Sequence, residues 1–291
     1  MKFRNLSQMA IALVAVFALS NAASAVLVVD ESFSQAVGTL NGAPAGTGLQ
    51  GNWISTTGTL ANVIASQTLS YGILPNAGNQ VDIPAGQAAG NARATTTSAL
   101  SDAGLLNNGA SLWFSVVTTG ASGSNQHSGF AFGNGFLAPS FDGARLDGDA
   151  LGFYTRQGTV RAAAWAAGGG LLPDFLSAGS LSAPQSSTNF IVGRIDWGAT
   201  AGDVETITLF TPSLATLALP GTSVSTSIAA FDQTTFNLVS FASRQGVQSF
   251  DEIRFGSSFN DVIGATAIPE PGSLVLLGIS SLAMLRRRRT A

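Results

Sequence analysis

The chain has 291 residues, a formal net charge of −3 and no cysteine. The lack of cysteine excludes a disulfide framework and any thiolate metal site. Residues 26–267 hold fifteen acidic residues, seven arginines and no lysine. Surfaces that bind nucleic acid need clustered cations to neutralise phosphates, so scattered arginines in an acidic body argue against that partner.

Residues 1–25 predict a secretory signal peptide. A charged start precedes an apolar run from Met9 to Leu19, and small residues follow at Ala23 and Ala25. Signal peptidase acts on this combination, which predicts cleavage before Val26 and export of the rest of the chain. The alternative interpretation of the run is a buried N-terminal helix.

Residues 26–267 predict one all-β domain, an antiparallel two-sheet jelly-roll sandwich. The segment is rich in Gly, Ser, Thr, Val and Phe, and runs of strand-like alternation such as "SLWFSVVT" and "FIVGRIDW" are separated by glycine-rich breaks. Many short strands with frequent turn signals favour this architecture. "TTTSALSDAGLL" predicts one short helix, and "TRQG" predicts a hairpin turn in which Gly158 takes a positive φ. The four tryptophans of the body lie in strand-like runs and are expected in the core: Trp53, Trp113, Trp165 and Trp197.

Residues 268–291 form a tail with an uncharged run, Ser273 to Leu285, followed by four arginines. A helix of that length covers about 20 Å, less than the ~30 Å hydrocarbon core of a bilayer. It can still insert if the bilayer thins, with the arginines on the cytoplasmic side and the body outside. The tail therefore predicts a short membrane helix that anchors the exported body transiently in the inner membrane.

The order of these features resembles the PEP-CTERM sorting signal of bacterial surface proteins. The resemblance implies recognition by an exosortase, which is expected to cut near the Pro-Glu-Pro and to release or attach the body at the cell surface. The alternative is an ordinary C-terminal anchor that is never processed. The residues that carry the resemblance are Pro269, Glu270, Pro271, Arg286, Arg287, Arg288 and Arg289.

The body resembles the concanavalin A-like and laminin G-like jelly rolls. Three segments carry the resemblance: "DESFSQAVGTLNGAPAGTGLQGNW", "HSGFAFGNGF" with "DGDALGFYTRQG", and "QSFDEIRFG". In the last of them, Glu252 and Arg254 are expected on one face of a strand, and Ile253 and Phe255 on the other. The superfamily includes lectins, adhesive modules and glycoside hydrolases, so the resemblance implies a fold and leaves the function open.

A glycoside hydrolase on this fold would need paired carboxylates on one strand face. The resembling hydrolases carry them as Glu-x-Asp-x-x-Glu, and none of the three glutamates of the body, Glu31, Glu205 and Glu252, stands in that pattern. Asp203 and Glu205 could share a face, and so could Asp147 and Asp149, but we interpret both pairs as exposed acids at strand edges.

His127 is the sole histidine, so it would have to serve as the base of any Ser-His-Asp arrangement. It lies in "GASGSNQHSG", which predicts a solvated loop residue. A zinc site is excluded by the supply of ligands.

Calcium is the one cofactor that the sequence leaves open. Asp142, Asp147 and Asp149 stand beside glycines in "FDGARLDGDALGF", and hard cations prefer several carboxylate and carbonyl oxygens. "DGDALGF" is similar to the segment that supplies a sugar-contacting aspartate in plant lectins. The alternative is that these residues cap turns at strand ends.

Together these features predict an exported, surface-sorted and non-enzymatic jelly-roll protein of the cell envelope or extracellular matrix, which contacts polysaccharide. Its expected partners are signal peptidase, an exosortase and, before processing, the membrane, with no nucleic acid. A calcium-assisted lectin is the first alternative, and a glycoside hydrolase with an unfamiliar carboxylate pair is the second.

Overall fold

The computed structural model describes residues 26–56, 62–74, 78–83, 90–119, 126–135, 148–167, 175–185, 187–213, 215–229, 231–244 and 247–264. These residues belong to one compact unit, Val26–Gly264. The predicted signal peptide, the sorting tail with its apolar run, Asp142 and Asp147 all lie outside the described residues. Within the described ranges, no helix has the length and apolar character needed to cross a membrane.

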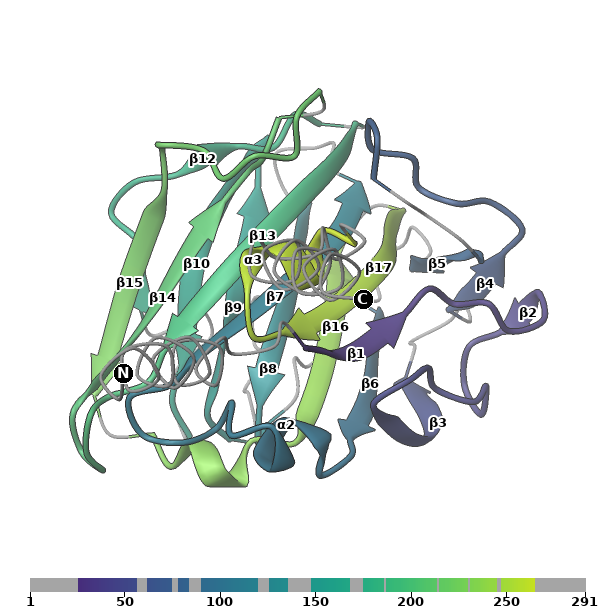
Figure 1. Ribbon diagram of the computed structural model, residues 1–291. Coiled ribbons are helices and arrows are strands. Elements are labelled where there is room, and N and C mark those ends of the chain that lie inside the picture. Colours follow the sequence, from purple (N-terminus) through teal and green to yellow (C-terminus); the bar gives the residue numbers. More distant parts are fainter. Residues whose placement is uncertain are drawn as a thin grey trace, which may run out of the picture. The chain divides into compact units, whose positions relative to one another are not determined.

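Two antiparallel sheets form the unit, which confirms the predicted jelly-roll sandwich (Figure 1). In the described residues, nine strands form one sheet and eight form the other, and consecutive strands repeatedly change sheet. Across the nine-stranded sheet the order is β15 (Val224–Ala229), β14 (Val204–Phe210), β13 (Thr188–Asp196), β7 (Ser111–Thr119), β17 (Gln248–Gly256), β5 (Gln80–Ile83), β4 (Val63–Ala65) and β2 (Gly38–Thr39), with β1 (Leu27–Glu31) beside β17.

The eight-stranded sheet lies behind the first in Figure 1. Its order is β11 (Phe175–Leu176), β10 (Thr159–Trp165), β9 (Ala150–Arg156), β8 (His127–Gly133), β16 (Leu238–Arg244), β6 (Gly90–Thr96) and β3 (Leu49–Thr56), with β12 (Leu181–Ser182) also beside β10. Three short helices complete the described fold: α2 (Ala99–Asp102), η1 (Gln233–Thr235) and α3 (Phe259–Val262).

Phenylalanine rings join the two sheets. Phe241 of β16 stacks on Phe250 of β17 with ring centroids 4.7 Å apart, and Phe114 of β7 lies 5.3 Å from Phe130 of β8. All four side chains are fully buried. Large rings in offset contact bury much apolar surface, so this layer supplies the stability that the chain cannot draw from disulfides.

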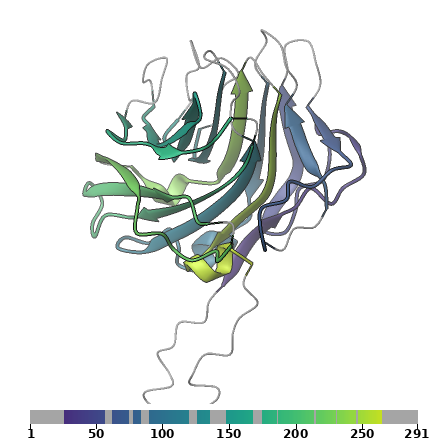
Figure 2. The same ribbon diagram turned by 90° about the horizontal axis from the view of Figure 1, so that it is seen from above.

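The alternation predicted for β7 is confirmed. Leu112, Phe114 and Val116 point into the interior between the sheets, whereas Trp113 and Val117 point outward into a second apolar cluster. That cluster includes α3 and the segment around Leu69. Figure 2 shows α3 against the outer side of the nine-stranded sheet. Apolar side chains therefore cover part of the outer face of this sheet.

Two further local predictions are confirmed. The short helix predicted in "TTTSALSDAGLL" is α2. The hairpin predicted at "TRQG" joins β9 to β10, with φ of 52° at Gln157 and 73° at Gly158. Two consecutive positive φ values match the twist of the flanking strands. The four tryptophans are buried, as expected, although only Trp53 and Trp197 lie in the interior core, and Trp113 and Trp165 lie in outer clusters.

The first prediction concerns the packing of Gly193 against Phe114, its register partner on β7. A methyl group on Gly193 would lie 2.1 Å from Cζ of Phe114. Gly193→Ala should therefore lower the free energy of unfolding by about 1–3 kcal/mol, because Phe114 has to move within a packed core. Urea unfolding measures this change. Gly221→Ala is the control, since an added methyl there meets nothing within 4 Å; equal midpoints for the two variants would contradict the prediction.

Candidate functional site

The outer face of the eight-stranded sheet carries a set of polar and cationic side chains. Phe241, Phe130 and Phe153 belong to the interior core, so their strand neighbours point outward. The register sets Arg244 opposite His127, and His127 opposite Arg156, in one row across β16, β8 and β9.

In the next outward-facing row of the sheet, Tyr154 of β9 lies opposite Arg161 of β10. Arg93 of β6 lies opposite Ser240 of β16, on the same face but farther along the sheet. We call this surface the cationic face; it is defined by Arg93, Arg156, Arg161 and Arg244.

A pocket of about 210 Å³ opens on the cationic face over the β9–β10 hairpin. The aliphatic Leu176 of β11 is opposite Ala163 and closes one side. The arrangement offers an aromatic hydroxyl, an amide, a threonine hydroxyl and two guanidinium groups to a polar ligand. The lining side chains are Tyr154, Arg156, Gln157, Thr159, Arg161 and Leu176.

The two sheets differ in charge. The described strands of the eight-stranded sheet contain four arginines and no aspartate or glutamate. All the acidic residues that lie on described strands belong to the nine-stranded sheet: Asp30, Glu31, Asp82, Asp196, Glu205, Asp251 and Glu252. The fold thus concentrates positive charge on one face of an acidic body. The prediction that the arginines are scattered is wrong for these four.

His127 is not the solvated loop residue that the sequence predicts. It begins β8 and is 5% exposed, and its Nδ1 shares a hydrogen bond with the hydroxyl of Tyr154. Burial, together with the charges of Arg156 and Arg244, lowers the pKa of His127 to about 4. Burial raises the pKa of Tyr154. Near neutral pH the pair is therefore an uncharged, hydrogen-bonded unit among cations.

Glu31 is a structural residue. Its carboxylate accepts hydrogen bonds from the backbone N–H groups of Phe33 at 2.7 Å and Gly46 at 2.7 Å, and from Trp53 Nε1 at 2.9 Å. Gln35 Nε2 donates a fourth at 3.2 Å. The side chain is 1% exposed. A buried carboxylate with four donors joins β1 to β3 and has no lone pair left for a substrate.

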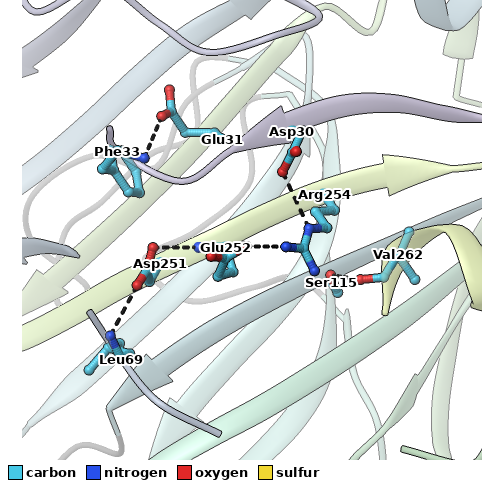
Figure 3. Close-up of polar contacts among 9 residues, drawn as sticks. All are labelled: Asp30, Glu31, Phe33, Leu69, Ser115, Asp251, Glu252, Arg254 and Val262. Carbon is cyan, nitrogen blue, oxygen red and sulfur yellow. Dashed lines mark hydrogen bonds and ion pairs between the residues drawn. The ribbon is translucent and has the colours of Figure 1, made fainter. Parts of the chain in front are cut away.

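A second buried polar cluster lies on β17 (Figure 3). Asp251 accepts hydrogen bonds from the N–H groups of Leu69 at 3.0 Å and Glu252 at 2.8 Å. Arg254 forms ion pairs with Glu252 and with Asp30. These contacts fasten the last long strand to β1 and to the segment that covers the nine-stranded sheet.

The faces predicted for this strand are confirmed, with an added irregularity. Ile253 and Phe255 belong to the interior core, while Glu252 and Arg254 pair on the other side. The register with β7 shifts between Asp251 and Arg254, and Glu252 has a φ of 50°. This bulge allows Phe250, three residues before Ile253, to point into the core as well.

Burial and, to a smaller extent, the neighbouring Glu252 carboxylate raise the pKa of Asp251, which lies at about 8. The two backbone N–H groups and the charge of Arg254 oppose this rise. The side chain is fully buried, so near neutral pH Asp251 is a structural acid that holds its proton.

Asp203 and Glu205 do not form the exposed pair that the sequence suggests. Asp203 is exposed in the turn before β14, where its carboxylate accepts hydrogen bonds from the N–H and hydroxyl of Thr200. Glu205 is 1% exposed and accepts a hydrogen bond from the N–H of Phe231 at 3.4 Å. One acid stabilises a turn and the other joins two segments of the fold.

Asp149 is the one described member of the predicted calcium set. Its Oδ1 accepts a hydrogen bond from the N–H of Ala167 at 2.8 Å, and its own N–H donates to Oδ1 of Asn134 at 2.6 Å. It therefore joins the segments that flank β8, β9 and β10. In the described residues, no group of three or more His, Cys, Asp or Glu side chains could hold a metal ion. The calcium site stays a prediction.

The tail matches a known motif. Residues 267–289 match the PEP-CTERM protein-sorting motif, which confirms the prediction from the tail residues. This motif indicates an exported protein that an exosortase sorts to the cell surface. No curated protein matches the chain by sequence.

Solved structures resemble the body only distantly. A protein of unknown function from Shewanella oneidensis MR-1 is 12% identical, with a TM-score of 0.43 over 83% of this chain and 92% of that one. Alginate lyase Aly36B with an alginate trisaccharide is 12% identical, with a TM-score of 0.45 over 78% and 96%. An endo-β-1,4-glucuronan lyase from the fungus Trichoderma reesei is 8% identical, with a TM-score of 0.41 over 81% and 98%. Scores this low carry no information on the function of the chain.

The second prediction concerns the electrostatic effect of the cationic face on the pKa of His127. Arg156→Gln should raise the pKa of His127 above about 4, although burial should keep it below the ordinary value of 6.5. The protein has a single histidine, so the ring C–H signals report this titration by NMR without assignment. Arg194→Gln, on the other sheet, is the matched control. An unchanged pKa in the Arg156 variant would contradict the prediction.

The third prediction concerns the pH dependence of stability. The unfolded chain loses the Asp251 proton near the ordinary pKa of 3.8, whereas the folded chain keeps it to about pH 8. The resulting stability is lost as pH rises through the folded pKa. His127, with its lowered pKa, acts in the opposite direction below pH 6.5. The urea midpoint should therefore fall between about pH 6.5 and 8.

Asp251→Asn should weaken this fall, because the amide does not titrate. Its midpoint at low pH should be below that of the wild type, since an amide nitrogen cannot accept the second backbone hydrogen bond. Asp203→Asn, at an exposed turn, serves as the control. A fall of unchanged size in the Asp251 variant would assign the pH dependence to other groups.

Proposed function

We propose that this exported, exosortase-sorted protein is a non-enzymatic surface or matrix component that contacts polysaccharide through the cationic face. The observation that carries the proposal is the polar pocket over the β9–β10 hairpin, lined by Tyr154, Arg156, Gln157, Thr159, Arg161 and Leu176. A polar pocket that combines an aromatic ring with several hydrogen-bond donors suits a hydroxyl-rich ligand. α3 and the segment around Leu69 cover part of the outer face of the opposite sheet, which favours the eight-stranded sheet as the ligand side.

The contacts of the carboxylates support binding over hydrolysis. Glu31 already accepts four hydrogen bonds, and Glu252 pairs with Arg254. A glycosidase needs two carboxylates that reach the substrate, one as acid and the other as nucleophile or base. Buried carboxylates engaged in joining strands are poorly placed for either role.

The fourth prediction tests the pocket by filling it. Thr159→Trp places a large ring among the lining side chains without changing the charge, and we expect about tenfold or greater loss of polysaccharide binding. Thr206→Trp on β14 is the matched control, because both threonines are partly exposed strand residues on different sheets. Affinity is measured with the exported protein collected from the cells that produce it, which we call the surface-released protein, against an array of neutral and acidic polysaccharides.

The array is run with calcium and with a chelator. Loss of binding on chelation would favour the calcium-assisted lectin. Equal binding by both tryptophan variants and the wild type would place the contact surface elsewhere. Failure to bind any polysaccharide would contradict the proposal, and release of reducing sugar ends would contradict its non-enzymatic part.

A further inference from the structure

We propose that the ligand is an acidic polysaccharide, whose carboxylate or sulfate groups bind to Arg156 and Arg161, with Arg244 and Arg93 extending the contact along the cationic face. This inference rests on the proposed function and adds the ligand class. The body has more than twice as many acidic residues as arginines, so this face is the described surface with the most favourable charge for such a polymer.

Positive and negative side chains lie on different sheets of the body. Four of the six described arginines lie on the cationic face, and the described strands of that sheet carry no acid. The field acts on a neighbouring group, since the charges of Arg156 and Arg244 help to lower the pKa of His127. Burial is the larger cause of this shift, but the part that comes from the two guanidinium charges would also favour a bound anion.

The two guanidinium groups at the pocket are accessible and unpaired within the described residues. Arg156 is exposed and Arg161 is partly exposed. Within the described part of the chain, neither side chain has an ion pair or hydrogen bond, whereas Arg194 pairs with Asp196 and Arg254 pairs with Glu252. A guanidinium presents a planar fork of donors that matches carboxylate or sulfate oxygens.

The arginines of the cationic face lie at intervals along the sheet. Arg156 lies opposite Thr159, so Arg161 is its diagonal neighbour, at about 7–8 Å. Arg244 lies two strands from Arg156 in the same row, which corresponds to about 10 Å. Arg93 lies on the far side of β16. Cations at such intervals suit a chain with repeated anionic groups better than one small anion.

The experiment compares three polymers with the surface-released protein: sodium alginate, dextran sulfate and unmodified dextran. We expect binding to at least one anionic polymer, with affinity that falls as salt rises, and much weaker binding to dextran. The two anionic polymers decide between carboxylate and sulfate as the preferred group. Arg156→Gln and Arg161→Gln should each weaken anionic binding about tenfold, and the double variant more.

Arg194→Gln removes the same charge from the other sheet and should leave binding unchanged. If a pocket variant fails to fold, the wild-type protein still provides a test: a bound polyanion should raise the pKa of His127, because it offsets the charges of Arg156 and Arg244. NMR titration of the single histidine measures this shift.

Binding to dextran as strong as to the anionic polymers would overturn the inference and leave the proposed function intact. Binding to neither anionic polymer would overturn the inference, and the proposed function would fall as well only if no polysaccharide of the array binds. Anionic binding that Arg194→Gln weakens as much as Arg156→Gln, or that leaves the pKa of His127 unchanged, would overturn the placement at the cationic face.

Discussion

The two-residue alternation of side chains along the eight-stranded sheet is the constraint on which both the core and the candidate site depend. Phe130, Phe153 and Phe241 point into the interior. Phe130 and Phe241 meet rings from the opposite sheet, and Phe153 stacks on Phe130. Their neighbours must then point outward, which sets Arg156 and Arg244 on the cationic face. A register slip of one residue would bury the arginines and expose the rings, so core packing and site formation are the same event.

The two sheets divide the structural and ligand-facing roles. The nine-stranded sheet holds the acidic residues of the described strands, and several of them are buried and bonded: Glu31 to four donors, and Asp251 to two backbone N–H groups. Its outer face is partly covered by α3. The eight-stranded sheet has no strand-borne acid in the described residues, and its outer face carries four arginines.

Features that depend only on neighbouring residues in the chain were predictable from the sequence. The β9–β10 turn needed only Gly158 and its neighbours, and the alternation of β7 was visible in "SLWFSVVT". His127 was mispredicted because its glycine- and serine-rich surroundings indicate a loop, whereas pairing with Arg156 and Arg244 makes it part of a strand. The cationic face was missed for a related reason: "FYTR" and "TVRA" each show an outward arginine, but neither shows that their strands are neighbours.

The sequence by itself determined the cellular destination and the architecture of this protein. The PEP-CTERM motif is a linear signal, and the alternation, glycine-rich turns and lack of cysteine restrict the body to a packed β-sandwich. Only the tertiary structure decided which charges act together. Arg93 and Arg244 are far apart in the chain, and strand pairing through β16 places them on one face. Coulomb interactions depend on distance in space, and the register of paired strands, which sets that distance, arises only when the sheet forms.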